Sequence, residues 1–224
     1  MREWMGLAVL AWALAGAPAL GAENGCEAVR LSVEPASRTD DVAATLRRRL
    51  QAAGAPSPEV EIAAPGVLRA TLPQGARETL LTRPASIEFR LVAKPDEAGA
   101  VALPRQDGQG AENVSPEIIL NETHLREFKL RTTPDGGAAL AFHFDPRAMK
   151  NLMAASTEAV GRKLAILVDG EIVADPEIRA PIASLTGEIP AGAASSAGEL
   201  VELLASGRLP AHVAIASREP CGKP

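Results

Sequence analysis

Histidines are the first residues to examine for metal binding or proton transfer, because an imidazole can do both near neutral pH. The chain has three, His124, His143 and His212, which are too few and too scattered for a metal site defined by spacing. His143 with Asp145 and the distant His124 could in principle bind zinc. Strand alternation, however, places His143 on the face opposite its phenylalanine neighbours, where a solvated histidine is ordinary. We therefore expect no metal site and no cofactor.

A group of carboxylates is the second candidate for chemistry. Asp169, Glu171 and Asp175 lie within seven residues of one another, and such a cluster could support acid–base catalysis or calcium binding. Asp169 and Gly170 also form the dipeptide that favours a two-residue hairpin turn, so we interpret the cluster as a solvated turn. The sequence has no G-x-S-x-G elbow, no phosphate-binding glycine loop and no Cys/His pair in a catalytic context. We expect no enzymatic activity.

The chain has two cysteines, one near each end. Cys26 and Cys221 would form a disulfide in an oxidising compartment and would then join the two ends of the folded part. Two free or separately paired thiols remain the alternative at this stage.

The first 22 residues have the pattern of an export signal. Arg2 precedes an apolar run at 4–15, and small residues surround a predicted cleavage site between Ala19 and Ala22. The alternative is an uncleaved signal that anchors the protein in the inner membrane. No later stretch of the sequence is apolar enough to cross a bilayer.

Composition permits a sizeable core and argues against nucleic-acid binding. The chain is 46% hydrophobic and 23% charged, with a formal net charge of -5. The one basic cluster, Arg47-Arg48-Arg49, lies in a predicted helix, and we interpret it as part of the solvated face of that helix. A protein that binds nucleic acid usually carries a strong basic patch, so we predict none of that activity here.

The first half of the sequence predicts a ferredoxin-like unit, which we call the base. Alternating residues at 29–33 indicate a strand, and apolar residues at helical spacing from Val42 to Ala53 indicate a helix that ends at Gly54. Two strands, a short helix and a strong strand follow, in the βαββαβ order that builds an antiparallel sheet with two helices on one face. The expected elements are strands at 59–63, 67–72 and 86–92 and a helix at 74–82, within a base at 28–92.

The second half predicts another α+β unit, the head, at 117–217. The segment 93–116 between the units is rich in proline and glycine, and we expect it to be a flexible linker. In the head, apolar runs and turn signals predict strands that include 138–144, 163–168 and 213–216, and helices at 145–160 and 195–206. The final residues, 218–224, are expected to form a tail that contains Cys221.

Several motifs resemble the SecD family of protein-export subunits. The segment 160–173, VGRKLAILVDGEIV, is similar to a run in that family where a helix end leads into a hairpin with an L-A-I-hydrophobic-hydrophobic-D-G turn. The segments 46–55 and 87–92 are similar to the base of the same periplasmic domain, so that the resemblance covers roughly 29–211. The head signature consists of Gly161, Leu164, Ile166, Asp169, Gly170, Pro176, Ile178, Ile182, Gly187, Ile189, Gly207, Leu209 and Pro210.

The resemblance implies a periplasmic, non-enzymatic binding protein that assists export by contacting unfolded or translocating polypeptide, with Sec translocon subunits as further partners. It implies membrane contact only through partners or through an uncleaved signal. The transmembrane helices of the family and its D-L-x-G-G stretch are not found, so force generation is not expected. The alternative is a structural or regulatory module that binds one defined envelope partner. The sequence identifies no polypeptide-binding residues.

Overall fold

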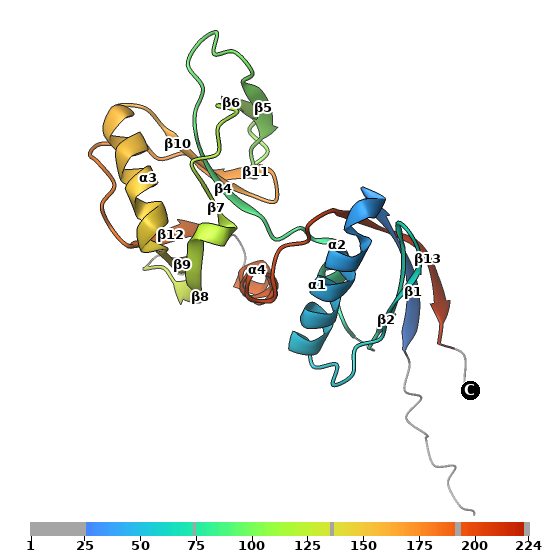
Figure 1. Ribbon diagram of the computed structural model, residues 1–224. Coiled ribbons are helices and arrows are strands. Elements are labelled where there is room, and N and C mark those ends of the chain that lie inside the picture. The colour runs from blue at the N-terminus through green and yellow to red at the C-terminus, as the bar shows by residue number, and fades with distance from the viewer. Residues whose placement is uncertain (1–25, 74, 135–136, 191–193, 222–224) are drawn as a thin grey trace, which may run out of the picture.

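The computed structural model describes residues 26–73, 75–134, 137–190 and 194–221 (Figure 1). The predicted signal at 1–22 and its cleavage site lie outside the described residues. Within the part described, no helix is long and apolar enough to cross a membrane.

The base is an antiparallel four-stranded sheet in the order β13-β1-β3-β2, with helix α1 on one face (Figure 1). Its elements follow the predicted βαββαβ order, but the sixth element comes from the far end of the chain. The base consists of β1 (Glu27–Glu34), a 3-10 turn (Ala36–Arg38), α1 (Thr39–Ala52), β2 (Val60–Ala64), β3 (Val67–Leu72), α2 (Thr79–Thr82) and β13 (His212–Pro220).

Strand alternation explains how the base sheet packs against α1. Val29, Leu31 and Val33 of β1 are at most 2% exposed and form one core with Val42 and Leu46 of the helix. The alternate residues of β1 therefore face away from α1, as the period of two in a strand requires. Among the residues that the structure describes, no helix covers the other face of the base sheet, which we call the uncovered face.

The last strand of the base differs from the sequence-based expectation. The strand expected at 86–92 is β4 (Ile87–Leu91), and it pairs with β10 (Leu164–Val168) in a head sheet instead of completing the base. Its Phe89 packs in the head core, where it makes edge contacts with Phe142 and Phe144 at centroid distances of 6.1 and 5.8 Å. Because the aromatic contact is long-range, residues 86–92 alone do not indicate which sheet the strand joins.

The head is consequently inserted into the base between α2 and β13. It contains a sheet of order β11-β10-β4-β7 and a second sheet of order β12-β9-β8, which share one core with helices α3 and α4. Its remaining elements are β7 (Leu120–Asn121), a 3-10 turn (Glu122–His124), β8 (Leu125–Thr132), β9 (Ala138–Phe144), α3 (Pro146–Glu158), β11 (Glu171–Ala174), β12 (Thr186–Pro190) and α4 (Ala194–Ser206).

The segment expected to be a linker contains a hairpin of β5 (Val101–Pro104) and β6 (Ala111–Val114). Val114 is fully buried and packs with Ala165 and Leu167 of β10 and with Ile172 of β11. Such a hairpin is difficult to predict from sequence, because its apolar runs are short and are separated by glycine and proline. The residues against which it packs lie more than fifty positions further along the chain.

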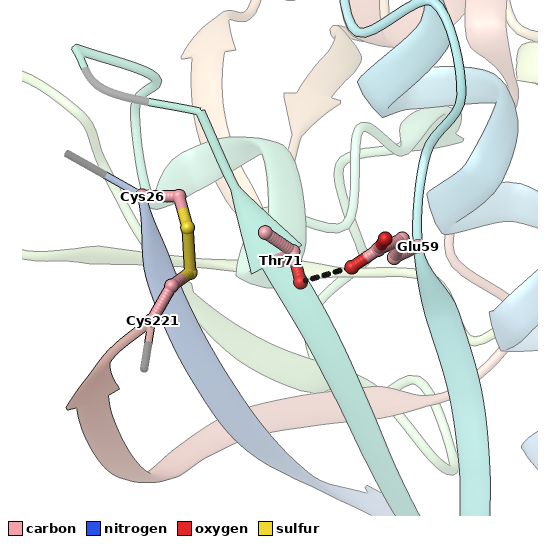
Figure 2. Close-up of a disulfide and its surroundings, with 4 residues drawn as sticks. All are labelled: Cys26, Glu59, Thr71 and Cys221. Carbon is pink, nitrogen blue, oxygen red and sulfur yellow. Dashed lines mark hydrogen bonds between the residues drawn. A yellow bond between two sulfur atoms is a disulfide. The ribbon is translucent and has the colours of Figure 1, made fainter. Parts of the chain in front are cut away.

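The two predicted cysteines form a disulfide (Figure 2). Cys26 precedes β1 and Cys221 follows β13, with Cα atoms 5.4 Å apart, and the Cys221 N–H donates to the Cys26 carbonyl at 3.1 Å. The expected tail therefore begins later than residue 218, because β13 continues to Pro220 and pairs with Glu27. The disulfide joins the first and last strands of the base at neighbouring positions in one sheet.

Candidate functional site

The junction between base and head is built around Arg49 of α1. Its side chain is fully buried, and its guanidinium donates hydrogen bonds to carbonyls of both connecting segments. The acceptors are Leu80 (3.2 Å), Arg83 (2.6 Å) and Pro84 (3.1 Å) before the head and Gly207 (3.2 and 3.0 Å) after it. Arg49 therefore holds together the two segments through which the chain enters and leaves the head.

Burial costs Arg49 part of its hydration but does not remove its charge. Desolvation lowers its pKa to about 10, while the negative charge of Asp169 acts in the opposite direction. The guanidinium is therefore protonated at neutral pH and keeps all its donors. The interpretation of the arginine cluster as solvated is correct for Arg47 and Arg48, which are exposed, and wrong for Arg49.

Asp169 ties the head to the first connecting segment. One carboxylate oxygen lies 2.7 Å from Arg83 Nε, and the other accepts the backbone N–H of Ser86 at 2.9 Å. The dipeptide forms a hairpin turn, as predicted, with φ of 52° at Asp169 and 88° at Gly170. The carboxylate itself, however, is only 17% exposed, which corrects the expectation that it is solvated.

Asp175 is also engaged in ion pairs, whereas Glu171 is exposed as expected. The Asp175 carboxylate accepts from Arg105 at 2.9 Å and from Lys163 at 2.8 Å, and these two hydrogen bonds lower its pKa to about 2. Arg105 follows β5 and Asp175 follows β11, so the ion pair between them connects the β5–β6 hairpin to the head sheet. The carboxylate cluster is therefore structural, since two of its three members bind cations of the same chain.

The head signature falls into three spatial groups. One group surrounds β10, where loop hydrogen bonds link Gly161 to Ile178 and Leu164 to Pro176. A second lies in β12, where a Cβ on Gly187 would stand 2.7 Å from the Phe142 ring. The first group is Gly161, Leu164, Ile166, Pro176, Ile178 and Ile182, the second is Gly187 and Ile189, and the third, at or beside the junction, is Asp169, Gly170, Gly207, Leu209 and Pro210.

The third group explains why the signature continues beyond the head. Leu209 is buried in the base core, and its N–H donates to the Pro84 carbonyl at 3.0 Å, so that the two connecting segments run side by side. Gly207 has φ of 101°, a conformation that favours glycine, and it turns the chain out of α4 while offering its carbonyl to Arg49.

A shallow groove of about 520 Å³ lies beside the junction, between α1 and α4. Ala52 of α1 and Val201 and Ala205 of α4 supply its apolar lining. Its polar lining comes from Arg48, Gln51, Glu202 and Ser206, and the Arg48 Nε donates to the Ser206 carbonyl at 3.1 Å across the groove.

These groove residues could not be identified from the sequence. Ala52 and Ala205 are ordinary exposed alanines in helices about 150 residues apart, and no local pattern shows that the two helices meet. Arg49, in contrast, carried a usable signal. It lies seven residues after Val42 and three after Leu46, so it falls on the apolar stripe of α1, where a charge is not expected to be solvated.

The histidines have separate structural environments. His124 Nδ1 accepts the Asn121 backbone N–H at 3.2 Å, and His143 is half-exposed with Nδ1 3.5 Å from a Glu127 oxygen. His212 begins β13 in the base. Over the residues that the structure describes, no three His, Cys, Asp or Glu side chains form a group able to hold a metal ion.

Comparison with known proteins relates the chain to one family. The family model described as "SecDF, P1 head subdomain" matches residues 100–211. The protein translocase subunit SecD of Acetobacter pasteurianus is 26% identical over 191 residues, which cover 79% of this chain and 37% of that protein. The SecD of Treponema pallidum is 26% identical over 134 residues, covering 57% of this chain and 23% of that protein. The chain thus spans little more than a third of its curated relatives at most.

Two solved structures share the fold. One comes from work on the structure and function of SecDF, a membrane component that enhances protein export. It matches with a TM-score of 0.67 and 19% identity over 85% of this chain and 98% of that chain. The other, a crystal structure of SecDF in a super-membrane-facing form, has a TM-score of 0.69 and 20% identity over 88% of this chain and 30% of that chain.

Proposed function

The chain belongs to the family of the SecDF P1 head subdomain, and from this premise we propose that it is a periplasmic, non-enzymatic binding protein of protein export. In this role it binds unfolded or translocating polypeptide and docks on subunits of the Sec translocon. The relatives are subunits of the protein translocase, and one solved neighbour is described as enhancing protein export. An exported location agrees with the disulfide between Cys26 and Cys221, since such bonds persist in oxidising compartments.

The observation that carries the proposal is the groove between α1 and α4. Its apolar lining consists of small side chains, Ala52, Val201 and Ala205, so it can accept apolar side chains of different shapes. A site that must accept many sequences benefits from this lack of shape selection. The polar rim of Arg48, Gln51 and Glu202 offers hydrogen bonds to an extended backbone without requiring a particular side chain.

The openness of the groove implies weak binding. Full burial of one Val, Leu or Phe side chain contributes about 1.5–3 kcal/mol, and a shallow groove covers such a side chain on one side only. Association also loses translational and rotational freedom, which costs roughly 4 kcal/mol or more. We therefore expect dissociation constants of roughly 0.1–1 mM for a single segment of unfolded chain. Weak binding allows release, which a protein that handles moving polypeptide requires.

The test is a pair of matched alanine-to-glutamate substitutions. Ala205→Glu places a charge in the groove, whereas Ala154→Glu places the same charge on an exposed position of α3. Binding of a carboxymethylated, permanently unfolded polypeptide is measured by fluorescence anisotropy. We expect Ala205→Glu to weaken binding about tenfold, because the longer charged side chain occupies part of the groove and loses hydration when an apolar segment binds beside it. Equal affinities of the two variants for this polypeptide would show that the groove is not its binding site.

Crosslinking in intact cells, followed by mass spectrometry, tests the role in export. Recovery of translocon subunits together with many unrelated exported chains supports the proposal. Recovery of one defined envelope protein and no exported clients supports the second candidate, a structural or regulatory module. The observation that favours this second candidate is the polar, uncovered face of the base sheet, where exposed residues such as Arg30, Glu61 and Arg69 replace an apolar surface.

A further inference from the structure

Two arginines lie side by side on the uncovered face of the base sheet. Arg30 of β1 is directly opposite Arg69 of β3, and both side chains are exposed on the side away from α1. Within the described residues, neither guanidinium has a carboxylate oxygen within 4.0 Å. Like charges at directly opposite positions of an antiparallel pair repel each other, so this arrangement is unfavourable in the isolated protein. An anion between the two guanidinium groups would relieve the repulsion.

The same row of the sheet continues with different residues on its outer strands. Glu61 of β2 is opposite Arg69, and Ser217 of β13 is opposite Arg30. Glu219 of β13 is exposed on the same side of the sheet, two residues beyond Ser217, and it is opposite Ala28 of β1. From β2 to β13 this row is therefore negative, doubly positive and neutral, and a second negative charge, Glu219, lies two residues further along β13.

Small side chains keep this face open around the arginines. Two hollows of about 340 and 290 Å³ lie on this face; Ala28 and Arg69 line both, and Arg30 lines the second. The first hollow also contains the disulfide and Thr71, whose hydroxyl donates to the Glu59 carboxylate at 3.0 Å (Figure 2). A partner side chain can therefore approach the sheet in the second hollow, which both arginines line.

We propose that this face docks a protein partner through a strip with one Asp or Glu flanked, two residues away on each side, by Lys or Arg. The two planar guanidinium groups offer paired donors that match a carboxylate. Neighbouring strands are about 4.8 Å apart, so β2 and β13 each lie about 7 Å from the line midway between β1 and β3. In an extended segment laid across the strands, side chains two residues apart are separated by about 6.7 Å. When the segment runs obliquely toward Glu219, its central carboxylate meets the arginines and its two basic side chains meet Glu61 and Glu219.

Other occupants fit this charge pattern less well. A membrane or nucleic acid presents a broad negative surface, which Glu59, Glu61 and Glu219 would repel. A second copy related by a two-fold axis over the centre of the face would bring four arginines together. The docking is independent of the groove between α1 and α4, and it would hold even if the groove bound no polypeptide.

The test compares two synthetic peptides in a nuclear magnetic resonance titration of the purified, oxidised protein. The first peptide is acetyl-Lys-Ala-Glu-Ala-Lys-amide, and the second has Gln in place of Glu. We expect the Glu peptide to shift the amide signals of β1 and β3 and to bind about fivefold or more tightly than the Gln peptide. The double variant Arg30→Gln/Arg69→Gln should lose this preference. The matched control Arg147→Gln/Arg179→Gln, which removes two exposed arginines from the head, should keep it.

Three results would overturn the proposal. The first is equal binding of the two peptides, no binding of either, or binding that the Arg30→Gln/Arg69→Gln variant retains. The second is flotation with phosphatidylglycerol vesicles that depends on the two arginines, which would identify a lipid surface. The third is a dimer in sedimentation velocity that the same variant abolishes, which would identify a second copy. None of these measurements uses unfolded polypeptide, so their failure is separate from a failure of the proposed export function.

Discussion

At the scale of single residues, Arg49 of α1 holds together the two segments that connect base and head. It is fully buried, yet no apolar side chain of similar length could replace its five hydrogen bonds to four carbonyls. The fixed positions of these carbonyls orient the guanidinium. The guanidinium, by bonding to all of them, holds the two connecting segments in place.

We predict that Arg49→Met lowers the free energy of unfolding by about 3 kcal/mol or more, because several buried carbonyls lose a charged donor together. Arg48→Met is the matched control, since Arg48 precedes it in the same helix and is exposed. Urea denaturation followed by circular dichroism measures both variants. A loss below about 1 kcal/mol for Arg49→Met would contradict the role assigned to it.

Asp175 makes stability depend on pH in the acidic range. Its pKa is lowered to about 2 in the folded protein by Arg105 and Lys163, so its carboxylate stabilises the fold above the unfolded value, near 3.8. This contribution is lost as the pH falls from about 4 through 2. Asp175→Asn should therefore lower stability by about 1–2 kcal/mol at pH 7 and much less near pH 2. Thermal unfolding of both proteins at the two pH values measures this, and an equal loss at both would refute it.

At the scale of elements, the disulfide is a constraint on β1 and β13. These neighbouring strands lie at opposite ends of the described chain, and Cys26 and Cys221 close a loop with a sequence separation of 195. Without the bond, formation of this strand pair must bring together segments separated by the whole head.

Cys26→Ser/Cys221→Ser should lower the free energy of unfolding by up to about 5 kcal/mol in the loop-entropy model. We expect the base to lose stability more than the head, because the bond joins two base strands and no head element. Hydrogen exchange resolved by residue measures this difference. Equal loss of protection in β1 and β9 would show instead that the two units unfold as one.

The second element-scale prediction concerns the contact between β12 and β9. A Cβ at Gly187 would lie 2.7 Å from ring atoms of Phe142, and that ring is held by Phe144 at a centroid distance of 5.1 Å. Because the ring cannot move without disturbing the aromatic cluster, Gly187→Ala should cost about 1–3 kcal/mol. Gly198→Ala in α4 is the control, since nothing lies within 4 Å of a Cβ there, and it should be neutral or stabilising. Equal melting temperatures of the two variants would contradict the predicted clash.

At the scale of the whole molecule, the head is an insertion whose two ends meet. Leu209 donates to Pro84 at 3.0 Å, and Arg49 binds both connecting segments. The base core contains residues from both sides of the insertion, Leu81 before it and Leu209 and Val213 after it. The base core therefore includes β13 and both connecting segments.

We predict that the base folds after residues 87–206 are replaced by a short Gly-Ser linker, because the remaining ends, Ser86 and Gly207, belong to segments that already run side by side. A cooperative thermal transition and protected amides in β1 and β3 would demonstrate folding. A chain cut after residue 211 is the comparison, and it should not fold, since β1 would lose its partner β13. The prediction fails if the two shortened chains behave alike.

Features that depend on neighbouring residues and on chemical type could be predicted from the sequence. Alternating residues at 29–33 and 86–92 predicted strands, Asp169-Gly170 predicted a hairpin turn, and two cysteines predicted a disulfide. The motifs from Gly161 to Pro210 were sufficient to indicate the family. These signals are local, because strand and turn preferences arise from steric contacts within a few residues.

Which strands share a sheet, and which side chains meet across it, could be known only from the folded protein. The strand at 86–92 joined the head and residues 212–220 completed the base, because aromatic packing around Phe89 and the disulfide act between distant segments. The same holds for Arg49 at its four carbonyls and for the pair of Arg30 and Arg69. Both arrangements depend on strand register or on helix contacts between segments tens of residues apart. The periodicity of a sequence identifies a strand or a helix, but it does not identify the element against which that strand or helix packs.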